Sequence, residues 1–160
     1  MNKKSFLSGQ SALEFALILP LLFFMVTAIF DLGRAVFASS TLNNAAREGS
    51  RFATIQNKNG ATLQTAGITT TICQTSSSDI ALVTNVKNKV CTYVYNIKDI
   101  KQNTTIEVFY SGTGGTNPTV TVHLIYKFKP ITPGMAAILG KGKYLTINSL
   151  STMYLQAIAK

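Results

Sequence analysis

The chain has 160 residues, of which 46% are hydrophobic and only 13% are charged. Its 15 basic and 6 acidic residues give a formal net charge of +9. This composition excludes an intrinsically disordered chain, and so low a charged fraction is unlike that of an ordinary soluble protein. The length allows one domain with an appended segment.

An apolar segment near the N-terminus is the strongest feature of the sequence. It covers about 12–30, and no charged residue occurs from Phe15 to Phe30. A helix that crosses a bilayer needs roughly 17 to 25 predominantly apolar residues. The segment therefore predicts a transmembrane helix.

The residues around this segment exclude a cleaved secretory signal. The small residues Ser8 and Gly9 precede the apolar run, and no A-x-A-like site follows it. Lys3 and Lys4 lie on the short N-terminal side, which the positive-inside rule keeps in the cytoplasm. The prediction is a single-pass protein of the cytoplasmic membrane with its N-terminus inside and residues 57–160 exported.

A single long helix is predicted over 10–56. Ser11-x-x-Glu14 is typical of a capping box at a helix N-terminus, and no convincing stop follows before the breaker at 57–60. Such a helix would be about 65 Å long at 1.5 Å per residue. Pro20 lacks a backbone donor and is expected to kink or locally melt it.

Glu14 is unusual because a carboxylate at the mouth of an apolar run is costly to bury in lipid. In one interpretation its side chain caps the helix. In the other, cleavage after Gly9 makes Gln10 the new N-terminus, and the ammonium of one subunit neutralises Glu14 of its neighbour in the low-dielectric membrane.

Three stretches carry a resemblance to a known family. Basic residues, a glycine and then Glu-Phe before an apolar run look like the class III leader of type IV pilins and pseudopilins. More specifically, the chain resembles TadE-like pseudopilins of the tight-adherence (Flp pilus) machinery, through "GQSALEFALILPLL", "IFDLGRAVFASSTLNNAAREGSRFA" and "VTVHLIYKFKPITP" with "LTINSLSTMYLQ". The residues from about 57 to 118 do not contribute to this resemblance.

The resemblance implies a minor pseudopilin whose leader, residues 1–9, is removed between Gly9 and Gln10 by a prepilin peptidase. It makes Glu14 and Phe15 the determinants of N-terminus pairing during assembly. The implied partners are other pilins and pseudopilins, an inner-membrane assembly platform and its ATPase, and the implied destination is the pilus or cell surface. The alternatives are an unprocessed membrane-anchored binding protein (an adhesin, or a binder of DNA or another polyanion) and a main filament subunit.

Further helix residues are expected to take part in packing against the exported domain or a neighbouring subunit: Pro20, Asp31, Gly33, Arg34, Arg47, Glu48, Gly49 and Arg51. Asp31 and Arg34 are three residues apart and can pair at the outer boundary. Gly49 permits a close backbone approach. An exposed, salt-bridged helix is the alternative for 47–51.

The sequence of the exported part predicts a small antiparallel sheet with one or two short helices. The whole chain is therefore expected to have an α+β, pilin-like fold. A helix is expected over 76–90, starting at Ser78 or Asp79, and a helical turn at 135–139. Strands are expected at 91–97, 105–111 and 120–129, and from Tyr144 onward. One face of the third strand is apolar: Val120, Val122, Leu124, Tyr126 and Phe128.

The two cysteines, Cys73 and Cys91, both lie beyond the predicted anchor. Their spacing suits no metal site, and an oxidising compartment would pair them. Two unrelated buried thiols are the alternative.

No catalytic, metal or cofactor site is predicted. The exported part contains one histidine, His123, and three acidic residues, Asp79, Asp99 and Glu107, without a suggestive spacing or a nucleophile motif. His123 is expected on the solvent side of its strand. The chain is therefore not expected to be an enzyme.

Past Ile55 every basic residue is a lysine: Lys58, Lys87, Lys89, Lys98, Lys101, Lys127, Lys129, Lys141, Lys143 and Lys160. Thinly spread lysines favour a solvated surface with weak attraction to anionic polymers or DNA. The interleaved tyrosines either stack on bases or pack within strands: Tyr93, Tyr95, Tyr110 and Tyr126.

Overall fold

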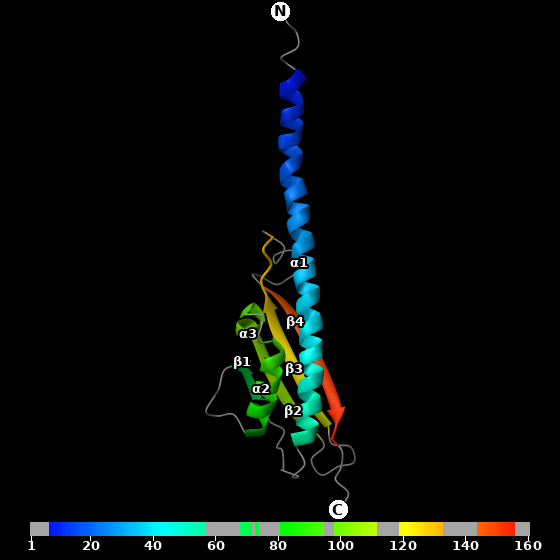
Figure 1. Ribbon diagram of the computed structural model, residues 1–160, viewed down its shortest axis with the longest axis vertical. Helices are drawn as coiled ribbons and strands as arrows, with labels where there is room; N and C mark the ends of the chain where they lie inside the picture. The colour runs from blue at the N-terminus through cyan, green and yellow to red at the C-terminus, as the bar shows by residue number, and fades with distance from the viewer. Residues whose placement is uncertain are drawn as a thin grey trace, which may run out of the picture.

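The computed structural model describes residues 7–56, 68–71, 73, 81–94, 98–111, 119–132 and 144–155. Its elements are α1 (Leu7–Gln56), β1 (Ile68–Thr71), α2 (Ala81–Val94), α3 (Lys98–Asn103), β2 (Thr104–Ser111), β3 (Thr119–Phe128) and β4 (Leu145–Tyr154). Figure 1 shows a small domain beside the C-terminal half of α1, while the N-terminal half projects alone. The predicted α+β class is confirmed.

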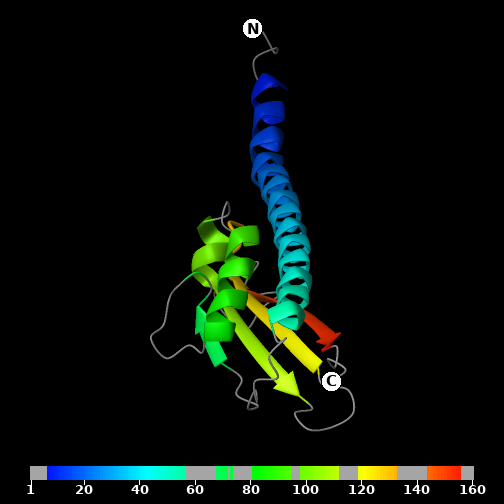
Figure 2. The same cartoon turned by 60° about the horizontal axis from the view of Figure 1, so that its bottom comes forward.

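The four strands form one antiparallel sheet in the order β1-β2-β3-β4. The hairpin register pairs Glu107 with His123, and the next register pairs Val122 with Ser151. Helices α1 and α2 pack side by side over one face of this sheet (Figure 2). The sheet therefore has an inner face toward the helices and an outer face toward solvent.

The core lies between the helices and the inner face. The alternation predicted for the third strand is confirmed, since its five apolar residues from Val120 to Phe128 are at most 2% exposed. Helix α2 contributes valines at helical spacing: Val83, Val86, Val90 and Val94. Helix α1 contributes one leucine and several small residues: Ala38, Leu42, Ala45, Ala46 and Ala53.

Gly49 lies where α1 packs closely against α2 and β3. A Cβ atom added there would be 2.5 Å from Val90 Cγ2 and 3.5 Å from Val122 Cγ1. The absence of a side chain therefore brings α1 into direct contact with both α2 and β3. Gly33 differs, because a Cβ there would meet nothing within 4 Å.

The beginning of the long helix corrects two predictions. The helix starts at Leu7, so Ser11 and Glu14 lie inside it and do not cap it. The helix also continues through Pro20 without local melting. A proline removes one backbone hydrogen bond, and the turns on either side maintain the helix across that loss.

The prediction of a strand at 91–97 is wrong for the first four residues, which form the last turn of α2. Valine, tyrosine and threonine favour strands locally, but Val94 continues the buried helical series of Val86 and Val90. The strands predicted from 105, 120 and 144 are confirmed as β2, β3 and β4, while β1 and α3 were not predicted individually. Residues 95–97, the helix start at Ser78 or Asp79 and the turn at 135–139 lie outside the described residues.

Replacing Gly49 by alanine is expected to destabilise the domain. The added methyl group overpacks the contact with Val90, which costs about 1–3 kcal/mol, and the better helix propensity of alanine offsets about 1 kcal/mol of that. The matched control is Gly33→Ala, which adds the same methyl group in open space. Thermal unfolding of the full chain in detergent should show a lower Tm for Gly49→Ala alone. Equal Tm values would contradict the tight crossing.

Candidate functional site

The N-terminal turns of α1 present Gly9, Gln10, Glu14 and Phe15 on an exposed surface. Gln10 Nε2 donates a hydrogen bond to Glu14 Oε1 over 3.3 Å, one helical turn away. The amide of Gln10 is neutral, so this contact satisfies an oxygen of Glu14 without compensating its charge. A Cβ atom added at Gly9 would meet nothing within 4 Å.

The next turns of α1 carry apolar side chains that the domain does not cover. The exposed large residues in this half are Leu13, Phe15, Leu17, Ile18, Leu19, Leu21, Leu22, Phe23, Phe24, Met25, Val26, Ile29 and Phe30. The polar hydroxyl of Thr27 is satisfied inside the helix, donating to the carbonyls of Phe23 and Phe24. By length and composition this helix can cross a membrane. It fits a single-pass membrane anchor.

Asp31 joins the end of the apolar segment to the domain. Its side chain is only 1% exposed. Oδ1 accepts the backbone N–H of Ile131 over 3.0 Å, and Oδ2 accepts that of Thr132 over 2.7 Å. Arg34 Nη1 lies 3.4 Å from Oδ1. One carboxylate therefore ties α1 to the segment that follows β3.

These contacts keep the buried carboxylate ionised. Burial acts to raise the pKa of Asp31, but the hydrogen bonds from Ile131 and Thr132 and the positive charge of Arg34 outweigh it and lower the pKa below 3.8. The guanidinium of Arg34 also lies 5.3 Å from the centroid of the Phe128 ring. The expected pair of Asp31 and Arg34 forms, but the backbone donors were missed. They lie about a hundred residues away, where sequence spacing carries no signal.

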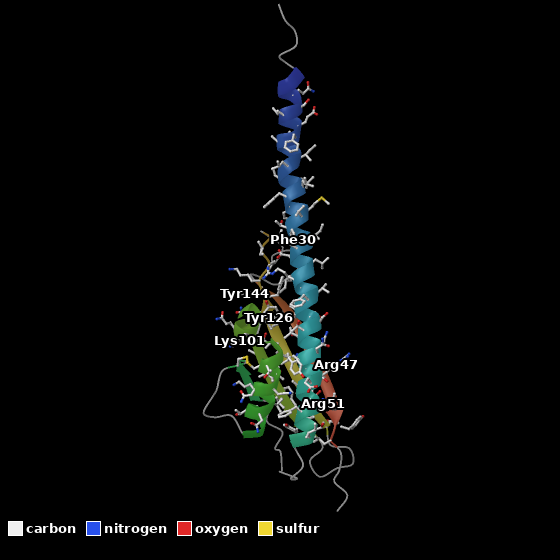
Figure 3. All side chains as sticks on the ribbon, viewed as in Figure 1. Phe30, Arg47, Arg51, Lys101, Tyr126 and Tyr144 are labelled. Carbon is white, nitrogen blue, oxygen red and sulfur yellow. A yellow bond between two sulfur atoms is a disulfide. The ribbon has the colours of Figure 1, made fainter. Side chains whose placement is uncertain are left out.

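A second cluster lies farther along α1. Arg51 contacts Glu48 through two hydrogen bonds, Nε to Oε2 over 2.9 Å and Nη2 to Oε1 over 2.6 Å. The bond from Arg51 is the largest cause that lowers the pKa of Glu48, and Lys89 and Tyr93 of α2 act in the same direction. Arg47 and Arg51 are both exposed on the packed half of α1 (Figure 3). Within the subunit, 47–51 thus combine an exposed ion pair with the close packing at Gly49.

Polar contacts also join α1 to β4. Ser50 Oγ lies 2.8 Å from Ser151 Oγ, and Ser149 Oγ donates to Asn43 Oδ1 over 2.7 Å. A disulfide between Cys73 and Cys91 links the residue just beyond β1 to α2, with the Cα atoms 5.3 Å apart. The edge strands are therefore held to the helices at both sides of the sheet.

His123 lies on the outer face of the sheet, as expected from its place opposite the apolar face. Its Nδ1 is 3.0 Å from Glu107 Oε2 of the neighbouring strand. Spacing along the chain did not predict this pair, and only the hairpin register brings the two residues together. Among the described residues no group of three or more His, Cys, Asp or Glu side chains forms a metal site.

Part of the surface that was expected to attract polyanions is not available, because some of its residues are buried. Tyr110 and Tyr126 are 3% and 1% exposed and pack in strands, so they are not available to stack on bases. Burial raises the pKa of Tyr110 to about 12. Lys87 is 2% exposed, so it does not belong to a solvated lysine surface. Tyr93 is exposed but lies on a helix, and Tyr95 is outside the described residues.

The comparison with known families matches the N-terminal part of the chain. The family described as TadE-like protein matches residues 9–51, about a quarter of the sequence. No curated protein and no solved structure matches the chain significantly. The matched segment begins at Gly9 and ends at Arg51, so it covers the apolar half of α1 and most of its packed half. In this segment the chain is similar to the TadE-like family.

Removing the carboxylate of Asp31 is expected to loosen the domain from α1. Asp31→Ala leaves the buried N–H of Thr132 and the partly buried N–H of Ile131 without their acceptor, and hydrogen bonds to a charged group are worth about 1.5–3 kcal/mol each. We expect the free energy of unfolding to fall by roughly 2–4 kcal/mol. Arg34→Ala is the control, expected to cost at most about 1 kcal/mol because its side chain is partly exposed. Equal losses in urea unfolding would contradict the role of the backbone bonds.

The lowered pKa of Asp31 predicts that the stability of the folded chain depends on pH. Because its pKa is lower in the folded chain than its ordinary value of 3.8, its contribution to stability is complete above about pH 4. That contribution is lost as the pH falls toward the folded pKa. Stability measured from pH 6 to pH 3 should therefore fall more steeply for the natural chain than for Asp31→Asn, which has no proton to bind. Parallel curves would argue against an ionised Asp31.

Proposed function

We propose that this chain is a minor pseudopilin of a tight-adherence, Flp-type pilus or secretion system. It would be inserted with its N-terminus in the cytoplasm, cut after Gly9 by a prepilin peptidase and assembled through α1. The observation that carries the proposal is the N-terminal half of α1, whose large apolar side chains from Leu13 to Phe30 are exposed. The TadE-like match over the same half supports it.

Processing is supported by the residues at the start of α1. Gly9 is the first residue of the family match, and the preceding residues include Lys3 and Lys4. Cutting between Gly9 and Gln10 would make Gln10 the first residue of α1. The basic leader would be lost and the apolar helix kept, as an anchored and later assembled subunit requires.

Glu14 supports assembly with other subunits. Its carboxylate is exposed on a helix that enters the bilayer, and its contact within the described subunit is the neutral amide of Gln10. A charge in that position requires an opposite charge close by. The ammonium created at Gln10 by cleavage, supplied by a neighbouring subunit, would meet this requirement.

The outward surface of α1 supports the same conclusion beyond the apolar segment. Leu32, Val36 and Phe37 are 64%, 57% and 60% exposed although they follow the end of the 12–30 segment. Gly33 lies among them with open space around its Cα, which lets another helix approach closely. Other pilins and pseudopilins would cover this surface in the assembled pilus.

The exported domain favours a minor subunit over the main filament subunit, because a domain of this size is unlike the short Flp-type major subunit. Its partners before assembly would be the peptidase, the inner-membrane platform and the platform's ATPase. The competing function is an unprocessed anchor that displays a binding domain. The two differ in whether the leader remains on the chain.

Intact-mass and N-terminal peptide analysis tests the processing step. The protein recovered from membranes and from sheared surface material of a host with an active prepilin peptidase is expected to begin at Gln10. A chain that still carries Met1 to Gly9 would overturn the proposal and leave a membrane-anchored binding protein.

A Glu14→Ala variant tests the assembly step. We expect it to be cut normally but to be lost from sheared surface material, because the carboxylate that pairs with the neighbouring N-terminus is missing. Ser11→Ala is the matched control, since it changes the same exposed turn without removing a charge. Normal assembly of Glu14→Ala would show that the pairing does not take place, whatever the state of the N-terminus.

A further inference from the structure

The hydrogen bonds of Asp31 place an exposed apolar residue at the end of the membrane segment. Ile131 is 68% exposed, and its N–H lies 3.0 Å from Asp31 Oδ1. Asp31 directly follows the 12–30 segment, which at 1.5 Å per residue is about 28 Å long, close to the roughly 30 Å of a bilayer's hydrocarbon core. The backbone of Ile131 is therefore held at the level where that core ends.

The residues around Ile131 match the chemistry of a membrane surface. Leu32 is 64% exposed, Tyr144 is 43% exposed and Lys129 is exposed, while the Arg34 side chain is 41% exposed. Figure 3 shows Tyr144 and Phe30 at the end of the domain from which the bare half of α1 projects. We call these five residues the boundary patch: Leu32, Arg34, Lys129, Ile131 and Tyr144.

The charge of the boundary patch is positive. Lys129 and Arg34 supply two cations, and the buried carboxylate of Asp31, which Arg34 contacts, offsets one of them, so that one positive charge is left. Tyrosine is enriched at the headgroup level of membrane proteins, and basic side chains near the surface are attracted to anionic lipids. Apolar, aromatic and basic side chains thus lie at the same end of the domain, near the level where headgroups begin.

We propose that the boundary patch docks on the surface of an anionic bilayer while the subunit is anchored there. Ile131 and Leu32 enter the boundary between acyl chains and headgroups, Tyr144 lies at headgroup level, and Lys129 and Arg34 face lipid phosphates. The domain is then held in one orientation on the membrane. The exposed surface of α1 that other subunits would cover is therefore already oriented before assembly. This inference rests on the membrane-spanning part of the proposed function and does not require cleavage or filament formation.

Single tryptophan residues test this docking, because the natural chain has none. Three full-length variants are compared in vesicles of phosphatidylcholine and phosphatidylglycerol: Ile131→Trp in the boundary patch, Tyr154→Trp at the far end of β4 and Phe23→Trp in the apolar segment. Tyr154 is the matched control, since it is 73% exposed and ten residues of strand, about 33 Å, separate it from Tyr144. Quenching is measured with acrylamide in water and with lipids brominated near the headgroup, and for Phe23→Trp with lipids brominated near the end of the acyl chain.

We expect Ile131→Trp to show a blue-shifted emission, quenching by brominated lipid and protection from acrylamide, all absent from Tyr154→Trp. In vesicles of phosphatidylcholine alone the shift and the protection should decrease, because the basic side chains lose their anionic partners. Such a result supports docking on lipid.

Three results would overturn the inference. In the first, Ile131→Trp behaves like Tyr154→Trp while Phe23→Trp is quenched by lipid, so that the helix spans the bilayer but the domain stands clear of it. In the second, Ile131→Trp is protected from acrylamide without quenching by lipid, so that another protein copy covers the patch. In the third, Phe23→Trp is not quenched either, and the membrane span of the proposed function fails as well.

Discussion

The buried carboxylate of Asp31 fixes how the domain sits on its helix. It binds two consecutive backbone N–H groups of the segment after β3 and lies next to Arg34. These bonds hold the domain at one end of its contact with α1, and the close crossing at Gly49 holds it farther along. Two contacts separated by five helical turns leave the domain little freedom to rotate about α1.

This arrangement makes α1 both an anchor and part of the core. No linker separates the apolar half from the half that packs under the sheet, since a single helix runs from Leu7 to Gln56. Ala45, Ala46 and Gly49 are fully or almost fully buried and bring α2 and β3 close to the helix axis. A force applied along the N-terminal half would therefore act directly on the hydrophobic core.

The sequence predicted the features that depend on local periodicity and missed those that depend on tertiary contacts. The alternation from Val120 to Phe128 identified β3 and its buried face, and the apolar run identified the bare helix. The residues from Cys91 onward favour a strand locally, and the prediction of a strand there is wrong because Val94 completes a helical series. The donors to Asp31 and the Glu107–His123 pair arise from contacts between segments, which one sequence does not encode as a pattern.

The candidate assembly residues follow from the energetics of the bare helix. Lipid chains are about as apolar as leucine side chains, so moving this helix from a bilayer into a bundle of similar helices gains little from the hydrophobic effect. Selectivity for other subunits must therefore come from features that lipid cannot match. In the proposed function the carboxylate of Glu14 would gain a charged partner in the bundle, and the open surface at Gly33 would allow a neighbouring helix to approach closely. In the proposed function, the carboxylate of Glu14 and the missing side chain at Gly33 therefore favour the assembled pilus over the membrane.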